Sequence, residues 1–190
     1  MSAGTPALSR RRLLTIAPLA VTVVAGAGFW AMLAGMRQGS FDPHDIHAPV
    51  LNRPVPDFAL PDQAPGQGFS TADLRAAGMP LLVNFFASWC IPCVIEAPVL
   101  AALRGRLPVW GIAYKDRPED AAGFVARTDA SYHRLAADRS GLSAIDWGVS
   151  GVPESFLIRP GGSIAWHLAG PLTPEIVSGE LLPLAAGMRR

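Results

Sequence analysis

The sequence predicts an α/β domain with a mixed central sheet flanked by helices, preceded by one apolar N-terminal helix. Three observations predict this fold class. An uncharged stretch of 24 residues follows a cluster of arginines near the N-terminus. Short apolar runs, which are typical of buried strands, then alternate with longer segments of helical spacing. Near the C-terminus a Pro-Gly-Gly turn joins two apolar runs, which indicates a hairpin of antiparallel strands.

The composition limits the possible functions. The chain has 190 residues, with 16 Lys and Arg against 15 Asp and Glu, so its formal net charge is +1. A charge balance this even gives no electrostatic case for nucleic acid as a partner. Half of the residues are hydrophobic and 16% are charged. We therefore expect one soluble domain plus a segment that lies in lipid.

The N-terminal segment predicts a membrane anchor. Three arginines at 10–12 precede residues 13–36, which carry no charge, and Arg37 follows. At about 1.5 Å per residue, such a helix spans a hydrocarbon core of about 30 Å. The positive-inside rule keeps basic residues 1–12 in the cytoplasm. It places the rest of the chain in the periplasm, tethered to the inner membrane by a single pass over 13–36.

Two other interpretations of this segment remain open. A cleavable signal peptide would have a shorter apolar region and a small-residue cleavage site, and no clean site follows the apolar run. Residues 9–14, Ser-Arg-Arg-Arg-Leu-Leu, resemble a twin-arginine export signal. Each alternative still places the rest of the chain outside the cytoplasm.

The exported part begins with a linker over 37–56, rich in Pro, His and Asp, and continues as a folded domain over 57–190. Ser-Thr-Ala-Asp at 70–73 indicates the start of a helix. Residues 81–86, Leu-Leu-Val-Asn-Phe-Phe, predict a strand buried on both faces, with core side chains at Leu82, Phe85 and Phe86.

The remaining elements follow in order. Residues 91–107 have helical length and spacing, with a kink expected at Pro98. Residues 109–114 predict the next strand. Residues 118–127 predict a helix with Pro at its first position and acids near its positive end.

The C-terminal elements are two strands that complete the predicted sheet and a last helix that packs on it. Residues 155–158 and 164–168 predict the two strands of the hairpin. A last helix begins at 174, again with Pro at its start.

The chemistry is predicted at the two cysteines of the chain, Cys90 and Cys93. A bridge between them closes too short a loop to stabilise the fold much. They follow a predicted buried strand and begin a helix, where unpaired N–H groups and the helix dipole favour an anion. Cys90 would thus form a thiolate at a lowered pKa, and Cys93 could resolve a mixed disulfide.

Metal-binding alternatives fit the residue types less well. A structural zinc site normally needs four ligands, and a haem attachment motif needs His where Val94 stands. A copper carrier stays open because five methionines and four histidines are present, although none has an evident ligand spacing. The histidines, which we expect to be structural or solvated, are His44, His47, His133 and His167.

Two segments carry a resemblance to a known family. Residues 86–93, Phe-Ala-Ser-Trp-Cys-Ile-Pro-Cys, followed by Glu96 and Pro98, resemble the active-site segment of the thioredoxin-like fold. Residues 148–156, Gly-Val-Ser-Gly-Val-Pro-Glu-Ser-Phe, resemble the segment with that fold's cis-proline. More narrowly, the domain is similar to the DsbE/CcmG thiol:disulfide interchange proteins of cytochrome c biogenesis. Further support comes from residues 56–60, 114–116, 146–149 and 167–172.

The resemblance implies roles for the cysteines and for the cis-proline segment. Cys90 is the attacking nucleophile, Cys93 is the resolving thiol, and their redox-active disulfide takes the place of a cofactor. Pro153 is a cis-proline that faces the sulfurs. Val152 offers its backbone to an extended substrate, and Trp89 helps to form the substrate groove.

The resemblance also points to acidic residues near the sulfurs, and it has departures. Asn84 stands where thioredoxins have a buried Asp, so Glu96 and Glu154 become the candidates for redox tuning and for moving the Cys93 proton. Ser155 stands where Thr is usual, and Val152 where Ala is common. We expect core and turn roles for Tyr114 and Asp146, and the larger Val152 to narrow the groove.

The function implied is reduction of the CxxC disulfide of apocytochrome c, or of a haem-ligation partner that holds its thiols. Electrons would then come from a membrane thiol-reductant transporter, because the exported compartment is oxidising. An alternative is a general exported thioredoxin-like reductase for another client, such as a copper-site assembly protein. A Cu(I)-binding assembly factor and a peroxide-reducing enzyme rank lower.

Overall fold

The computed structural model describes residues 10–37, 51–61 and 68–189. It divides into one unit over 1–46 and a second over 47–190. In the first, α1 (Arg10–Arg37) is a helix with Pro18 inside it. Among the residues that the structure describes, no helix is both long enough and apolar enough to span a membrane. Most of the predicted linker, including His44 and His47, lies outside the described residues.

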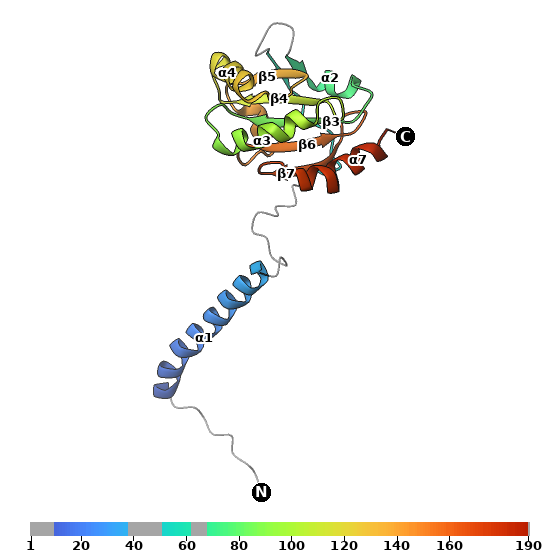
Figure 1. Cartoon of the computed structure of the whole chain (residues 1–190). Coiled ribbons are helices and arrows are strands. Elements are labelled where there is room, and N and C mark those ends of the chain that lie inside the picture. Colours follow the sequence, from blue (N-terminus) through green and yellow to red (C-terminus); the bar gives the residue numbers. More distant parts are fainter. Residues whose placement is uncertain (1–9, 38–50, 62–67, 190) are drawn as a thin grey trace. The chain divides into compact units, whose positions relative to one another are not determined.

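The second unit is built on a mixed sheet, as predicted, and this sheet has five strands, of which β5 (Arg134–Asp138) was not predicted (Figure 1). In spatial order the strands are β5, β4 (Val109–Tyr114), β3 (Leu81–Phe86), β6 (Glu154–Ile158) and β7 (Ile164–Ala169). Strands β3, β4 and β5 are parallel, β6 is antiparallel to β3, and β7 is antiparallel to β6.

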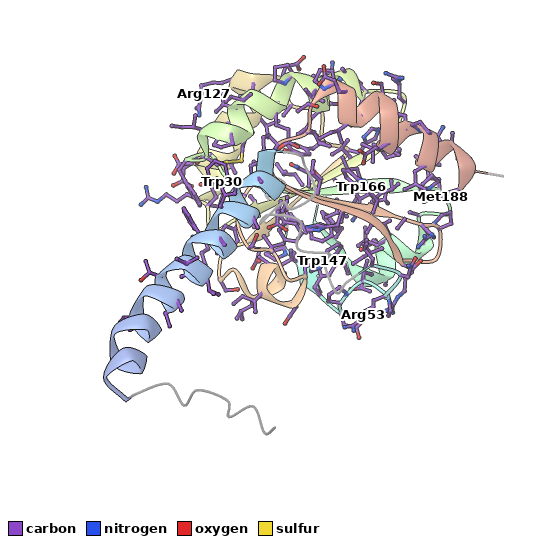
Figure 2. The ribbon with its side chains drawn as sticks, turned by 90° about the horizontal axis from the view of Figure 1, so that it is seen from below. Trp30, Arg53, Arg127, Trp147, Trp166 and Met188 are labelled. Atoms are coloured by element: carbon purple, nitrogen blue, oxygen red, sulfur yellow. A yellow bond between two sulfur atoms is a disulfide. The ribbon has the colours of Figure 1, made fainter. Side chains whose placement is uncertain are left out.

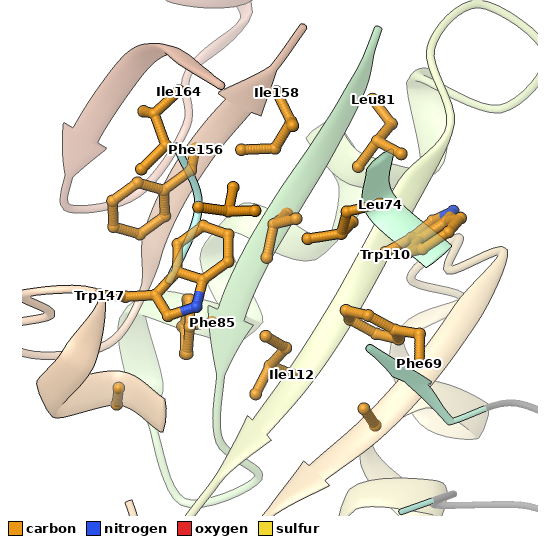
Figure 3. Close-up of a cluster of buried hydrophobic side chains, with 14 residues drawn as sticks. Phe69, Leu74, Leu81, Phe85, Trp110, Ile112, Trp147, Phe156, Ile158 and Ile164 are labelled. Atoms are coloured by element: carbon orange, nitrogen blue, oxygen red, sulfur yellow. The ribbon is translucent and has the colours of Figure 1, made fainter. Parts of the chain in front are cut away.

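One face of the sheet carries an aromatic core. Side chains alternate along β3, so Leu81, Val83 and Phe85 all face this side. Figure 3 shows Trp147 between Phe85 and Phe156, with ring centroids 5.6 Å and 5.0 Å away, respectively. The elements that cover this face are α2 (Thr71–Ala76), α5 (Leu142–Asp146) and the short hairpin of β1 (Ala59–Leu60) and β2 (Phe69–Ser70).

The opposite face of β3 presents Leu82, Asn84 and Phe86 to a second layer of helices. Figure 2 shows side chains filling the domain, with Trp147 in the interior and Arg127 on the outside. Trp166 and Met188 pack, half-buried, on this second layer. The layer consists of α3 (Ile91–Ala102), α4 (Pro118–Thr128), α6 (Pro174–Ile176), the π-helical turn η1 (Val177–Leu181) and α7 (Leu182–Gly187).

Several boundaries differ from those predicted. The helix expected over 91–107 ends at Ala102, and the chain then turns with Gly105 at a φ of +77°. Val55, which was assigned to the linker, is buried in the core, and Pro54 pairs with Ser163. The folded unit therefore begins before residue 57, because residues 51–56 pack against the turn that leads into β7.

The parallel strands gather the functional loops at one edge of the sheet. Strands β3, β4 and β5 end there, and the antiparallel strand β6 begins there. The segments 87–90, 115–117 and 147–153 therefore meet at this edge.

Candidate active site

The two cysteines lie at the junction of β3 and α3. Cys90 is the N-cap of α3, and the backbone N–H of Cys93 donates to the Cys90 Sγ over 3.1 Å. The sulfurs are joined in a disulfide with an S–S distance of 2.11 Å and Cα atoms 5.3 Å apart. A sulfur that accepts an N–H at a helix start is in the setting that stabilises a thiolate after reduction.

The loop before β6 faces these sulfurs. The Val152–Pro153 peptide bond is cis, as the sequence predicts. The carbonyl oxygen of Val152 lies 3.4 Å from the Cys90 Sγ. Within the described part of the chain, the Val152 N–H has no hydrogen-bond acceptor. Val152 thus has a free backbone donor next to the reactive sulfur, where an extended chain could pair with it.

Glu154 holds this loop with its carboxylate. The N–H and the hydroxyl of Ser150 donate to Oε1 over 2.7 Å and 2.6 Å, and the Gly151 N–H donates over 3.1 Å. The other oxygen, Oε2, lies 2.8 Å from the His167 Nε2. Burial alone would raise the pKa of Glu154, but the bonds from His167 and Ser150 outweigh it and hold the pKa below its usual value.

A second carboxyl group is buried beneath the helix that carries the cysteines. Glu96 lies one turn after Cys93 and is 1% exposed. Its Oε1 accepts a hydrogen bond of 3.1 Å from the Asn84 Nδ2, and its Oε2 has no partner among the described residues. Burial therefore raises the pKa of Glu96 to about 8, against the smaller lowering effects of the Leu172 backbone, Asn84 and Ser155.

Asn84 connects Glu96 to two further side chains. Its amide nitrogen also donates to the Ser155 Oγ over 3.0 Å, and its amide oxygen accepts from the Tyr132 hydroxyl over 2.8 Å. Burial and the nearby Glu96 raise the pKa of Tyr132 well above its usual value, so its phenol stays a donor. Asn84, which stands where thioredoxins have Asp, and Ser155, which stands where Thr is usual, thus form one buried network with Glu96.

Asp116 fixes the segment just before the cysteines. Its carboxylate accepts from the Ser88 N–H over 2.6 Å and from the Ser88 hydroxyl over 2.8 Å. Trp89 follows, with its ring centroid 6.5 Å from that of Tyr114. The position of Trp89 is therefore tied to the end of β4.

Exposed apolar side chains surround the buried sulfurs. Trp89 is 59% exposed and Ile91 is 75% exposed, although both flank Cys90. Val94 and Ile95 on α3 are exposed as well. This cap of Trp89, Ile91, Val94 and Ile95 is an apolar surface that a protein client could cover.

Sequence reasoning identified Trp89, Cys90, Cys93, Val152 and Pro153, and the structure brings these residues together. It places Glu96 in the buried network and Glu154 at the start of β6, where its carboxylate holds the preceding loop. His167, Tyr132 and the Ser88–Asp116 contact were missed. The predicted hairpin offered a signal for His167, because Phe156 pairs with His167 and so places Glu154 diagonally across from it on the same face.

The other site hypotheses concern metal ions. In the part of the chain that the structure describes, no group of three or more His, Cys, Asp or Glu side chains is placed to hold a metal ion. His133 is exposed, and Asp146 lies exposed at the end of α5.

Comparison with known proteins places the site in a family context. The redoxin family model matches residues 51–179. The thiol:disulfide interchange protein HelX of Rhodobacter capsulatus is 36% identical over 92% of this chain and 96% of its own length. The thiol:disulfide interchange protein DsbE of Escherichia coli K12 is 34% identical over 92% of this chain and 94% of its own. A thiol-disulfide oxidoreductase structure from Bacteroides fragilis is 27% identical with a TM-score of 0.57, covering 70% of this chain and 99% of its own.

Proposed function

Because this chain belongs to the DsbE-type thiol:disulfide interchange proteins of the redoxin family, we propose that it reduces the CxxC disulfide of apocytochrome c. The observation that carries the proposal is the backbone of Val152 beside Cys90. Its N–H has no acceptor among the described residues, and its carbonyl oxygen lies 3.4 Å from the Cys90 Sγ. It suits a client that presents its disulfide in an extended segment. A haem-ligation protein that holds the apocytochrome thiols would present a disulfide in the same way.

The proposed reaction has two thiol–disulfide exchange steps. The Cys90 thiolate attacks one sulfur of the client disulfide, so the client S–S bond breaks and a Cys90–client bond forms. The displaced client sulfur takes up a proton. Cys93 then loses its proton and attacks the Cys90 sulfur, which releases the second client thiol and forms the Cys90–Cys93 disulfide. The client gains two electrons, and the protein loses two.

Each of the predicted site residues has a place in this scheme. Trp89, Val152 and Pro153 bind the client segment. Glu96 is the proposed proton acceptor for Cys93, because it is a buried carboxyl group one helical turn away whose pKa burial raises to about 8. Glu154 tunes the site through the loop that it holds.

The protein must be reduced again after each turnover. The Cys90–Cys93 disulfide is the redox centre, so the electron donor is another dithiol protein rather than a soluble cofactor. In the periplasm a membrane thiol-reductant transporter is the donor that fits, because that compartment is oxidising.

We propose in addition that residues 13–36 anchor the domain in the inner membrane, with residues 1–12 in the cytoplasm. The absence of charge over this stretch, between basic flanks, supports the proposal. The full chain is expected to stay in the membrane pellet after an alkaline wash. A chain that lacks residues 1–37 but carries a separate cleavable export signal should be soluble in the periplasm. Full-length protein released by the wash would overturn the proposed anchor, and a shortened chain in the periplasm would indicate cleavage.

The proposed client is tested by trapping. A Cys93→Ala variant keeps the Cys90 nucleophile but lacks the thiol that releases the client, so mixed disulfides should accumulate in cells. They would be isolated under denaturing conditions, and the attached proteins would be identified by mass spectrometry. A double variant with Cys90→Ala is the control, and we expect it to trap nothing.

The trapped protein discriminates between the functions. Apocytochromes c, or a haem-ligation protein, support the proposed client. A copper-site assembly protein in their place would move the function to a general exported reductase with the same mechanism. No adduct from a well-expressed Cys93→Ala variant would count against Cys90 as the nucleophile and favour Cu(I) binding by the two thiolates.

A further inference from the structure

The loop that faces Cys90 depends on one carboxylate for its shape. Glu154 accepts four hydrogen bonds, three of them at Oε1 from Ser150 and Gly151. The residue after Gly151 is Val152, whose backbone lies beside the reactive sulfur. A change in the direction of the Glu154 carboxylate would therefore move the backbone that a client meets.

Among the residues that the structure describes, the Oε2 oxygen of Glu154 has a single partner, His167. The His167 Nε2 lies 2.8 Å away, and because the carboxylate only accepts, this nitrogen carries the proton and donates. Without that donor, a buried carboxylate oxygen would lose its only hydrogen bond. The carboxylate would then be free to rotate away from the loop.

His167 is itself held rigidly. It lies on β7, where its backbone pairs with Phe156 on β6. Its ring stacks on the Phe156 ring, with centroids 4.5 Å apart and planes 29° apart. Its side chain is almost buried, so the ring has a fixed position on the sheet.

We propose that His167 is a positioning residue for the client: through Glu154 it fixes the backbone of residues 150–152 opposite Cys90. This inference rests on the proposed binding of an extended client segment along Val152. It predicts a role in the reaction with peptide disulfides, which meet this backbone. Small disulfides have no peptide backbone to pair with Val152, so His167 should not affect their reaction at Cys90.

The test compares three disulfides as substrates of the reduced protein. One is a disulfide-bonded peptide with a Cys-x-x-Cys-His sequence, the second is an unrelated disulfide-bonded peptide, and the third is hydroxyethyl disulfide. In His167→Ala we expect the second-order rate constant to fall about tenfold for both peptides, the size of one lost charge-assisted hydrogen bond. We expect no change for hydroxyethyl disulfide.

Two further variants separate positioning from general damage. His167→Gln keeps one N–H donor and should recover most of the peptide rate, whereas a role in packing alone would not be rescued. Ser150→Ala removes a single exposed donor to Glu154 and should produce a smaller loss, again with peptides only. His133→Ala is the matched control. His133 is exposed and directly precedes β5, at the end of the parallel strands that lies away from the cysteines.

The outcomes are distinct. Unchanged peptide rates in His167→Ala and Ser150→Ala would overturn the inference, and so would equal losses for all three substrates. The proposed client is judged separately, by the wild-type protein alone. If the wild type does not prefer the Cys-x-x-Cys-His peptide over the unrelated one, that proposal fails while the role of His167 can still hold.

Discussion

The oxidised wild-type protein is expected to lose stability as the pH rises from about 5 to about 9, and Glu96→Gln is expected to abolish most of this loss. Burial raises the pKa of Glu96 from 4.5 to about 8, so the folded state favours the neutral carboxyl group. The resulting stability is fully present below the unfolded value and is lost as the pH rises through the folded value. Each pKa unit corresponds to about 1.4 kcal/mol, so the loss should amount to about 5 kcal/mol at high pH.

Denaturant unfolding of the oxidised protein at a series of pH values measures this effect. The wild type should lose stability towards pH 9, whereas Glu96→Gln should be nearly flat because its amide carries no charge to bury. Glu119→Gln is the control, since Glu119 is an exposed side chain on α4. Parallel curves for the wild type and Glu96→Gln would mean that Glu96 ionises at its usual pKa.

Glu154→Ala is expected to cost about 1–3 kcal/mol of unfolding free energy, the usual cost of leaving hydrogen-bond donors without their buried acceptor. The substitution leaves Ser150, Gly151 and His167 without their common acceptor. Denaturant midpoints at pH 7 measure the loss. Asp129→Ala removes a carboxylate from an exposed ion pair with Arg104 and should cost well under about 1 kcal/mol.

The pH dependence of the Glu154 contribution has the opposite sign to that of Glu96. Because the pKa of Glu154 is lowered in the folded protein, its stabilisation is present above its unfolded value of 4.5 and is lost as the pH falls through the folded value. Glu154→Gln should therefore weaken the protein at pH 7 and flatten its acid denaturation. An acid limb identical to that of the wild type would contradict the assigned contacts.

The sequence predicted the elements whose signals are local. The run at β3 is apolar except for Asn84, so a doubly buried strand followed from composition. Ser70 and Asp73 form the reciprocal cap that their spacing indicated. The cysteine pair could be assigned to the start of α3 because the strand before it and the helix after it both have local sequence patterns.

Other elements could not be predicted because their determinants lie elsewhere in the chain. The β5 segment, Arg-Leu-Ala-Ala-Asp, has low strand propensity and is a strand because β4 pairs with it. The five residues of α5 are too few for a periodic signal, and Asp138 binds the N–H of Ala144 in the first turn. In the site, Tyr132 reaches Asn84 across 48 positions, a contact that only the strand order reveals.

The burial of the two sulfurs also determines which molecules can exchange electrons with this protein. Only 4% of Cys90 and 1% of Cys93 are exposed, while the apolar cap around them is open to solvent. A reagent that merely collides with the surface rarely reaches sulfur, whereas a protein that covers the cap and aligns along Val152 does. We therefore expect the disulfide to exchange slowly with small thiols in solution and quickly with a partner protein that docks on the cap. If the protein works in the oxidising compartment proposed above, such gating would keep reducing equivalents from leaking away before they reach the proposed client.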